Sequence, residues 1–197
     1  MPGLFHVLAA FLVVLAVFHL SEALLIALID RRSLAWGSFL ISRPYCVAMS
    51  LAIAEFLVEA RLFPSWKAPG VFALVGAALI CAGEALRKTA ILVAGRSFTH
   101  QIAATKSAEH RLVTRGVYAW CRHPAYLGWS VWCIGTQLLL ANPICTIAFA
   151  VLAWRFFADR IAYEEQLLKR FFGDEFRAYQ ARVPVGLPLI GRRLNSQ

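Results

Sequence analysis

Long apolar stretches separated by short polar ones form the main pattern of the 197-residue chain. A helix that crosses a membrane requires about 20 mostly apolar residues. The pattern predicts three long helices, then a polar stretch at 94–123 and two shorter helices, with expected ranges of 4–29, 45–63, 71–93, 124–140 and 144–157. The Asn142-Pro143 pair predicts a turn between the last two, so that these helices form a hairpin.

Charged residues become frequent after position 157. Residues 158–183 mix apolar and charged positions in the manner of an amphipathic helix, and a break is predicted near Gly173 because glycine weakens helices. We therefore predict an all-α integral membrane protein with about five transmembrane or membrane-embedded helices. Residues 1–197 are expected to form one domain, with three N-terminal spans in 1–93 and the region that carries the chemistry in 94–197.

The composition agrees with a membrane protein and excludes an ordinary soluble domain. The chain is 60% hydrophobic and 16% charged, with a mean hydropathy of +0.64, whereas soluble domains are about 45–50% apolar and about 25% charged. The net charge of +9 could indicate nucleic acid. The basic residues are scattered among apolar spans, however, and form no stripe beside stacking aromatics, so anionic lipid headgroups are the expected partner and nucleic acid is not.

The distribution of Lys and Arg predicts the orientation in the membrane. Seven of the 20 basic residues lie in 87–123 and eight lie after 154. Cytosolic segments of membrane proteins carry an excess of Lys and Arg, so both regions are expected to face the cytosol. Counting back through the spans places the loop at 30–43, with Arg31, Arg32 and Arg43, on the cytosolic side, and the turn at 64–69 and the N-terminus on the lumenal side.

Cysteines, glycines and the chain ends argue against several other classes. The five cysteines form no C-x-x-C pair, and Cys121 with His123 offers too few ligands for a zinc site, so no metal is expected. No G-x-G occurs among the 12 glycines, which leaves a Rossmann-type nucleotide site without support.

The N-terminal run lacks the basic region of a signal peptide, so we expect a retained span. The ending "RRLNSQ" is no lipidation motif, so the chain itself is not expected to be prenylated.

Several ionisable residues lie inside the second and third apolar runs, namely Glu55, Glu59, Glu84, Arg87 and Lys88. Charges within a membrane are costly and are usually paired or functional. Two interpretations remain open: ion pairs between helices, with snorkelling at the interface, or a polar wall beside a lipid substrate.

Two glycines of the fourth run, Gly128 and Gly135, are seven residues apart and share one helical face. One interpretation is close helix packing through small residues. The other places them on the lipid-facing side, as a gate through which a lipid substrate enters.

The densest group of reactive side chains surrounds Pro124. His110, Tyr118, His123 and Tyr126 lie within 17 residues. Pro124 suits the first turn of a helix, where backbone N–H groups are left free. A histidine at such a place can be a ligand-binding group or an interfacial hydrogen-bonder.

Arg160 and Glu164 form a second feature, because their i, i+4 spacing places them on one helical face. A surface ion pair would explain this spacing by itself. Together with the group around Pro124, however, the pair predicts a polar chamber at the cytosolic face of the membrane.

These residues belong to strings that closely resemble the isoprenylcysteine carboxyl methyltransferases. The strings are "GRSFTH", "LVTRGVYAWCRHPAYLGW", "GTQLLLANPI", "WRFFADRIAYEE", "FFGDEFRAY" and "RVPVGLP", and the resemblance covers residues 84–190. It implies methyl transfer from S-adenosyl-L-methionine to the carboxylate of a C-terminal prenylated cysteine on processed CaaX proteins. It also implies an endoplasmic reticulum membrane protein whose active site faces the cytosol, with a C-terminal helix closing the cofactor chamber.

The resemblance also implies individual roles. Arg160 falls on the position that binds the substrate carboxylate. The cofactor-binding positions fall on His110, Arg111, Leu112, Val113, Tyr118, His123, Pro124, Ala125, Tyr126 and Glu164, with Arg111 and Ala125 acting through their backbone. Ala103 stands where some members have a glutamine, so only its backbone could contribute there.

Two other classes of function are considered beside this one. Membrane sterol reductases share a related C-terminal region, so an NADPH-dependent reductase is the alternative enzyme. A non-catalytic lipid-binding scaffold would explain the buried charges, but it would not explain why His110, Tyr118, His123, Arg160 and Glu164 occur together.

Overall fold

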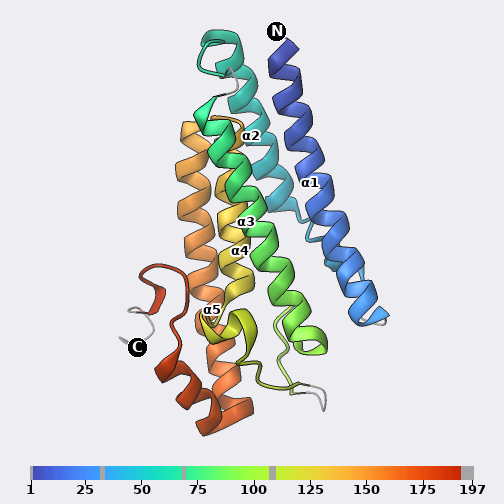
Figure 1. The fold of residues 1–197 in the computed structure, drawn as a ribbon, viewed down its shortest axis with the longest axis vertical. Coiled ribbons are helices and arrows are strands. Elements are labelled where there is room, and N and C mark those ends of the chain that lie inside the picture. The colour runs from blue at the N-terminus through green and yellow to red at the C-terminus, as the bar shows by residue number, and fades with distance from the viewer. Residues whose placement is uncertain (1, 32–33, 68–69, 107–109, 192–197) are drawn as a thin grey trace.

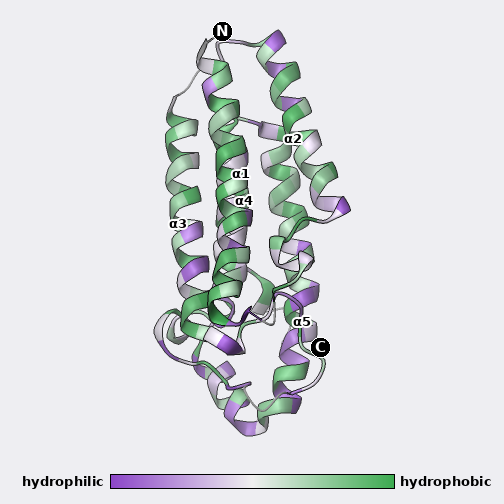
Figure 2. Ribbon diagram, turned by 90° about the vertical axis from the view of Figure 1, so that its right-hand side faces the viewer, coloured by the Kyte–Doolittle hydropathy of each residue, from purple (hydrophilic) through white to green (hydrophobic). Residues whose placement is uncertain are grey.

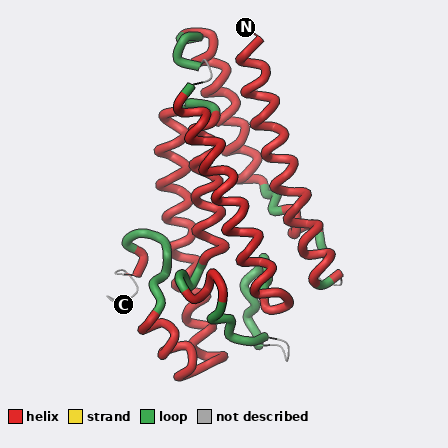
Figure 3. Tube along the Cα trace, in the orientation of Figure 1, coloured by secondary structure: helices red, strands yellow, loops and turns green. Residues whose placement is uncertain are grey.

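The computed structural model describes residues 2–31, 34–67, 70–106 and 110–191. Arg32, one of the basic residues used to predict the orientation, and the terminal "RRLNSQ" lie outside these ranges. Every regular element in the described part is helical, as predicted (Figure 3). The elements are α1 (Pro2–Ile29), η2 (Trp36–Phe39), α2 (Arg43–Leu62), α3 (Val71–Ala94), η3 (Gly95–Ser97), η4 (Gly116–Ala119), α4 (Pro124–Leu139) and α5 (Pro143–Arg182).

The long helices run side by side as a bundle, and the kinked end of α5 gathers with residues 95–106 and 110–123 at one end of it (Figure 1). Apolar residues cover much of the helices, and hydrophilic ones concentrate at that same end (Figure 2). Large aliphatic side chains such as Leu20, Leu28, Leu74 and Ile144 are mostly exposed. Soluble monomers rarely expose apolar surface on this scale, so the bundle is suited to contact with lipid.

Two segments, Gly3–Ile29 and Trp36–Leu62, are long and apolar enough to cross a membrane by length and composition alone. The predicted third and fourth spans are helices too, but α4 has only 16 residues and α3 contains Glu84, Arg87 and Lys88. The five predicted apolar runs are therefore all helical, and a count of five full spans stays a prediction.

The hairpin of α4 and α5 forms where the Asn142-Pro143 pair predicted it. The chain turns at Ala141, whose φ is 51°, and Pro143 occupies the first turn of α5. The carboxylate of Glu55 on α2 accepts hydrogen bonds from the backbone N–H groups of Ile144 and Cys145, at 2.8 and 2.7 Å. Glu55 thus satisfies donors that the start of a helix leaves free.

The two elements expected at 144–157 and 158–183 are joined in one helix, which corrects the prediction of a separate short fifth helix. The change from an apolar to a charged sequence near residue 157 leaves the helical backbone uninterrupted. The predicted break occurs at Gly173, whose φ of 52° lies in the left-handed region that favours glycine.

Close packing of α3 against α4 depends on four glycines. A methyl group added to Gly83 would lie 2.6 Å from the Gly128 carbonyl oxygen, and one added to Gly76 would lie 2.8 Å from that of Gly135. Gly128 and Gly135 therefore face α3, which corrects the suggestion that they line a lipid-facing gate. Their seven-residue spacing reflects small-residue packing of adjacent membrane helices.

Lys67 and Glu59 form an ion pair at the end of the bundle opposite η3 and η4 (Figure 1). Lys67 is 2% exposed, lies 2.6 Å from a carboxylate oxygen of Glu59, and donates to the carbonyl oxygens of Leu140 and Ala141 at 2.9 Å. Its fourth partner is the side-chain oxygen of Asn142, at 2.8 Å. Here the structure supports the interpretation of Glu59 as a paired charge, although its partner Lys67 lies in the turn after α2 and not on another helix.

Candidate functional site

A pocket of about 930 Å³, including its mouth, lies at the polar end of the bundle. It is bounded by residues 94–103, by residues 110–126 and by the stretch of α5 from Glu164 to Tyr179. All eleven residues that the family resemblance marks for the cofactor lie in its wall.

Residues 110–113 and Ala103 reach the pocket from irregular segments, and a local contact fixes the first of these. The backbone N–H of Arg111 donates to Ser97 Oγ at 3.2 Å, which ties the segment to η3. His110 Nδ1 is buried and has no hydrogen-bond partner among the described residues. An unpaired buried polar atom is costly, so this nitrogen is available to a ligand.

Residues 123–126 reach the pocket from the start of α4, and Tyr118 reaches it from η4. The Tyr118 carbonyl oxygen accepts a hydrogen bond from the Tyr179 hydroxyl of α5 at 2.6 Å. Burial raises the pKa of the Tyr118 and Tyr179 hydroxyls above their ordinary values. Both therefore act as neutral hydrogen-bonding groups near pH 7.

Apolar and aromatic side chains make up most of the remaining wall. Phe98 comes from the segment before residue 103, and Phe171, Phe172 and Phe176 come from α5 on either side of the Gly173 kink. Flat apolar walls with a few directed polar groups are typical of sites for cofactors that contain a ring system.

Arg160 and Glu164 meet through a third side chain. The Tyr126 hydroxyl donates to Glu164 Oε2 at 2.5 Å and accepts from Arg160 Nε at 3.0 Å. A second donor of Arg160, Nη2, binds the main-chain oxygen of His100 at 2.5 Å. The i, i+4 spacing correctly placed both residues on one side of α5. The interpretation of the two as a simple surface ion pair is wrong, because the Tyr126 hydroxyl lies between them.

Arg160 itself is not in the pocket wall. Its guanidinium carbon lies 5.5 Å from the centre of the Tyr126 ring and 6.0 Å from that of Phe156. It is therefore a half-buried cation at the edge of the pocket, held at the border between the chamber and the apolar bundle.

A buried network behind the pocket was missed by sequence reasoning. Glu165 is 2% exposed. One of its carboxylate oxygens accepts hydrogen bonds from Arg122 Nε at 2.8 Å and from His123 Nε2 at 3.1 Å. Its other oxygen accepts from the Gln180 side chain at 2.8 Å. Although burial raises the pKa of Glu165, these hydrogen bonds and the charge of Arg122 bring it below its ordinary value. Glu165 is therefore ionised, and it fixes His123 with Nε2 as the bound nitrogen.

The "RVPVGLP" string lies against the "CRHP" string. The backbone N–H groups of Arg122 and His123 donate to the carbonyl oxygens of Pro184 and Val185 at 2.9 and 3.3 Å. The Cys121 thiol also donates to Val185, at 3.1 Å. The two strings form one structural unit behind the pocket, although 57 residues of sequence lie between them.

The described residues contain no group of three or more His, Cys, Asp or Glu side chains that could hold a metal ion. Their fold and site define a class: an all-helical membrane protein with a small-molecule chamber at one end of the bundle and an arginine at the border between that chamber and the membrane helices.

Comparisons with known proteins identify the family. Residues 75–170 match the model of the isoprenylcysteine carboxyl methyltransferase family. The chain is 48% identical over 174 residues to protein-S-isoprenylcysteine O-methyltransferase B of Arabidopsis thaliana, with 88% of each chain covered. It is 46% identical over 178 residues to the Homo sapiens protein-S-isoprenylcysteine O-methyltransferase, covering 89% of this chain and 63% of that one.

A solved structure agrees with these relatives. The eukaryotic intramembrane Ras methyltransferase, an isoprenylcysteine carboxyl methyltransferase, superposes with a TM-score of 0.94 at 41% identity and covers 97% of this chain and 69% of its own. The chain therefore belongs to the isoprenylcysteine carboxyl methyltransferase family and is a membrane methyltransferase. This confirms the predicted family and enzyme class.

Proposed function

We propose that this chain transfers the methyl group of S-adenosyl-L-methionine to the C-terminal carboxylate of an S-prenylated cysteine on processed CaaX proteins. The product is a methyl ester. The reaction takes place at the cytosolic face of the endoplasmic reticulum membrane. The observation that carries the proposal is the position of Arg160, which is joined through Tyr126 to the pocket residue Glu164.

The lining of the pocket supports the choice of this cofactor. The unpaired His110 Nδ1, the Glu164 carboxylate and the aromatic wall match a ligand that combines an adenine ring, ribose hydroxyls and an amino acid group. When bound, S-adenosyl-L-methionine supplies a methyl group on a positively charged sulfur. Glu164 would accept hydrogen bonds from a ribose hydroxyl or from an amino group.

Arg160 would bind the substrate carboxylate. A C-terminal carboxyl group has a pKa of about 3.3–3.7 and is ionised near pH 7, so no side chain must remove a proton to create the nucleophile. Contacts with described residues occupy two of the five guanidinium N–H groups of Arg160. The remaining donors can hold the carboxylate while one oxygen stays free to attack. The chain then contributes alignment and exclusion of water.

The prenyl group would reach Arg160 from within the membrane. Each buried CH₂ contributes about 0.8 kcal/mol to the partition of a lipid chain into the bilayer, so passage through water would be costly. The apolar surface of the bundle allows a bilayer-resident chain to approach the edge of the pocket. The water-soluble cofactor enters from the polar end of the bundle.

The proposal is tested with the purified full-length chain, S-adenosyl-L-methionine carrying an isotope-labelled methyl group, and N-acetyl-S-farnesylcysteine. We expect labelled, base-labile ester without consumption of NADPH. Arg160→Lys should reduce turnover at least a hundredfold, because lysine cannot form the paired hydrogen bonds of a guanidinium. Arg155→Lys is the matched control, since Arg155 is exposed on the same helix. Absence of ester with the native chain refutes the function, and normal turnover of Arg160→Lys refutes the role of Arg160.

A further inference from the structure

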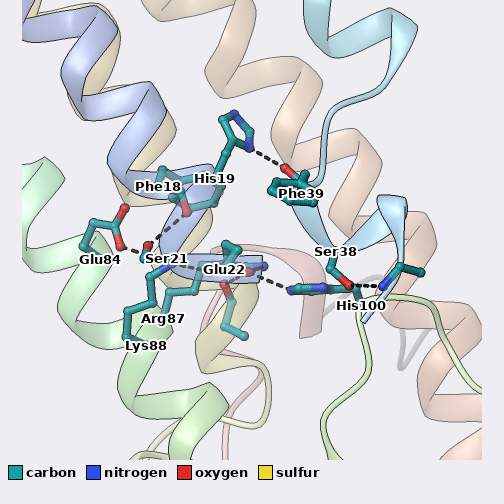
Figure 4. Close-up of polar contacts among 12 residues, drawn as sticks. Phe18, His19, Ser21, Glu22, Ser38, Phe39, Glu84, Arg87, Lys88 and His100 are labelled. Atoms are coloured by element: carbon teal, nitrogen blue, oxygen red, sulfur yellow. Dashed lines mark hydrogen bonds and ion pairs between the residues drawn. The ribbon is translucent and has the colours of Figure 1, made fainter. Parts of the chain in front are cut away.

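A cluster of ionisable residues, here called the Glu22 cluster, is buried between α1, α3 and the segment that follows η3. It consists of Glu22, Arg87, Lys88 and His100 (Figure 4). Glu22 has no exposed surface. Arg87 binds its two oxygens at 2.9 and 2.7 Å, Lys88 lies 2.5 Å from one oxygen, and His100 Nε2 lies 2.7 Å from the other.

The cluster is close to electrically balanced. Lys88 also lies 3.3 Å from Glu84, so two carboxylates face an arginine, a lysine and a histidine. The His100 nitrogen that faces Glu22 acts as a hydrogen-bond donor, since a carboxylate can only accept. Glu22 thereby fixes the orientation of His100, a residue of an irregular segment outside the helices.

Two further contacts connect the Glu22 cluster to the site. The main-chain oxygen of His100 is the acceptor for Arg160 Nη2, at 2.5 Å. Arg87 Nη1 donates to the carbonyl oxygen of Ala125, at 3.1 Å, and Ala125 precedes Tyr126, the other partner of Arg160. The cluster therefore supports both hydrogen bonds that orient the Arg160 guanidinium.

Packing alone does not account for this arrangement. A buried ion pair often stabilises a protein no more than apolar side chains of the same volume would, and α1 already contacts the rest of the bundle through apolar residues such as Phe11 and Phe18. An ionic cluster does what apolar packing cannot: it fixes a hydrogen-bonding segment to a defined position.

We propose that Glu22 and His100 are positioning residues for Arg160, so that the membrane helix α1 sets the geometry of carboxylate binding. This inference rests on the proposed role of Arg160. Loss of the Glu22–His100 contact releases the His100 carbonyl, turns the guanidinium away from the reacting oxygen, and lowers the use of prenylcysteine rather than the binding of cofactor.

The test compares His100→Ala, His100→Gln and Glu22→Gln with His19→Ala. His19 is a matched control because it is a buried histidine one turn from Glu22 on α1. Its hydrogen-bond partners are the Phe39 carbonyl at 2.5 Å and the Tyr45 hydroxyl at 2.7 Å, and not Glu22 or Arg160. Measurements on the full-length chain are kcat and KM for N-acetyl-S-farnesylcysteine, the Kd of S-adenosylhomocysteine, and the midpoint of thermal unfolding.

We expect His100→Ala and Glu22→Gln to lower kcat/KM for the prenyl substrate at least tenfold, while the Kd of S-adenosylhomocysteine changes less than twofold. His100→Gln should recover most of the activity, since its amide can still donate to Glu22. The thermal midpoint of His100→Ala should fall no further than that of His19→Ala, which keeps near-native kcat/KM.

Two results overturn the inference while leaving the proposed function intact. One is native kcat/KM in His100→Ala. The other is a loss of kcat/KM in His100→Ala together with lower cofactor affinity and a lower thermal midpoint, when His19→Ala shows the same losses and His100→Gln does not restore them. That result would mean that His100 has only a packing role. A native chain that forms no ester refutes the proposed function, and this inference with it.

Discussion

Gly128→Ala should loosen the contact between α3 and α4. The added methyl carbon would lie 2.7 Å from the Gly83 carbonyl oxygen and 2.8 Å from the Arg87 backbone nitrogen, whereas ordinary contacts of such a carbon begin at 3.4 Å. Both neighbours are backbone atoms, so no side chain can rotate away and the helices must separate.

The magnitude follows from two opposing effects. Overpacking a tightly packed contact costs about 1–3 kcal/mol, and replacing glycine by alanine inside a helix returns at most about 1 kcal/mol. Because the methyl group meets backbone atoms, the upper part of the overpacking range applies, about 2–3 kcal/mol. The net loss is then about 1–2 kcal/mol, and for a chain of this size each kcal/mol lowers the thermal midpoint by about 2–4 °C. Activity should fall as well, because the same methyl group meets Arg87 Cβ at 2.9 Å and Arg87 holds the Ala125 carbonyl.

Thermal unfolding of the purified protein in detergent measures the effect. Gly37→Ala is the matched control, since the nearest atom to its methyl group, Gln101 Nε2, lies at 3.7 Å, and its midpoint should change little. An unchanged or raised midpoint for Gly128→Ala would contradict the close approach of the two helices. So would a drop of the same size in Gly37→Ala.

Two further predictions concern the carboxylates of α5. Glu164→Gln should raise KM for S-adenosyl-L-methionine about tenfold, equal to about 1.4 kcal/mol, and more than it raises KM for the prenyl substrate; a rise for the prenyl substrate alone would show that Glu164 is misassigned. Glu165 has a pKa below its ordinary value of 4.5 in the folded chain, so its contribution to stability is fully present above pH 4.5 and is lost as the pH falls below that value towards the lowered pKa. Thermal midpoints measured from pH 6 to pH 3 should fall more steeply for the native chain than for Glu165→Gln, and equal slopes would refute this assignment.

Local signals in the sequence were sufficient for the turn between α4 and α5 and for the kink within α5. The Asn142-Pro143 turn and the Gly173 kink each depend on the backbone preference of one or two residues, and both were predicted correctly. The continuity of α5 through residue 157 could not be predicted, because hydropathy records where a helix meets lipid or water and not where its hydrogen bonds end. The direction in which Gly128 faces could not be predicted either. The sequence shows which residues share a helical face, but it does not show which neighbouring helix packs against that face.

The candidate site was predictable to a different extent. The family resemblance selected residues that the fold brings into one pocket, although their individual roles stay predictions. The network of Arg122, Glu165 and Gln180 was not predicted. Glu165 lies 43 residues from Arg122 and 15 residues from Gln180, and no periodicity links an arginine before a proline to a glutamate in a distant helix. The doublet of Glu164 and Glu165 was the available signal, since one carboxylate of the pair faces the pocket and the other faces the network.

These networks explain why charged residues precede an apolar helix at Pro124. On one side, Glu165 binds Arg122 and His123; on the other, Arg87 of the Glu22 cluster binds the Ala125 carbonyl. The start of α4 is therefore held from α5 and from α3 at once, and Tyr126 projects from this fixed turn to lie between Arg160 and Glu164. A single ion pair would leave the turn free to tilt, and Tyr126 with it. Two buried carboxylates on opposite sides define its position, so substitutions at Glu22 and Glu165 should impair the same catalytic step through separate contacts.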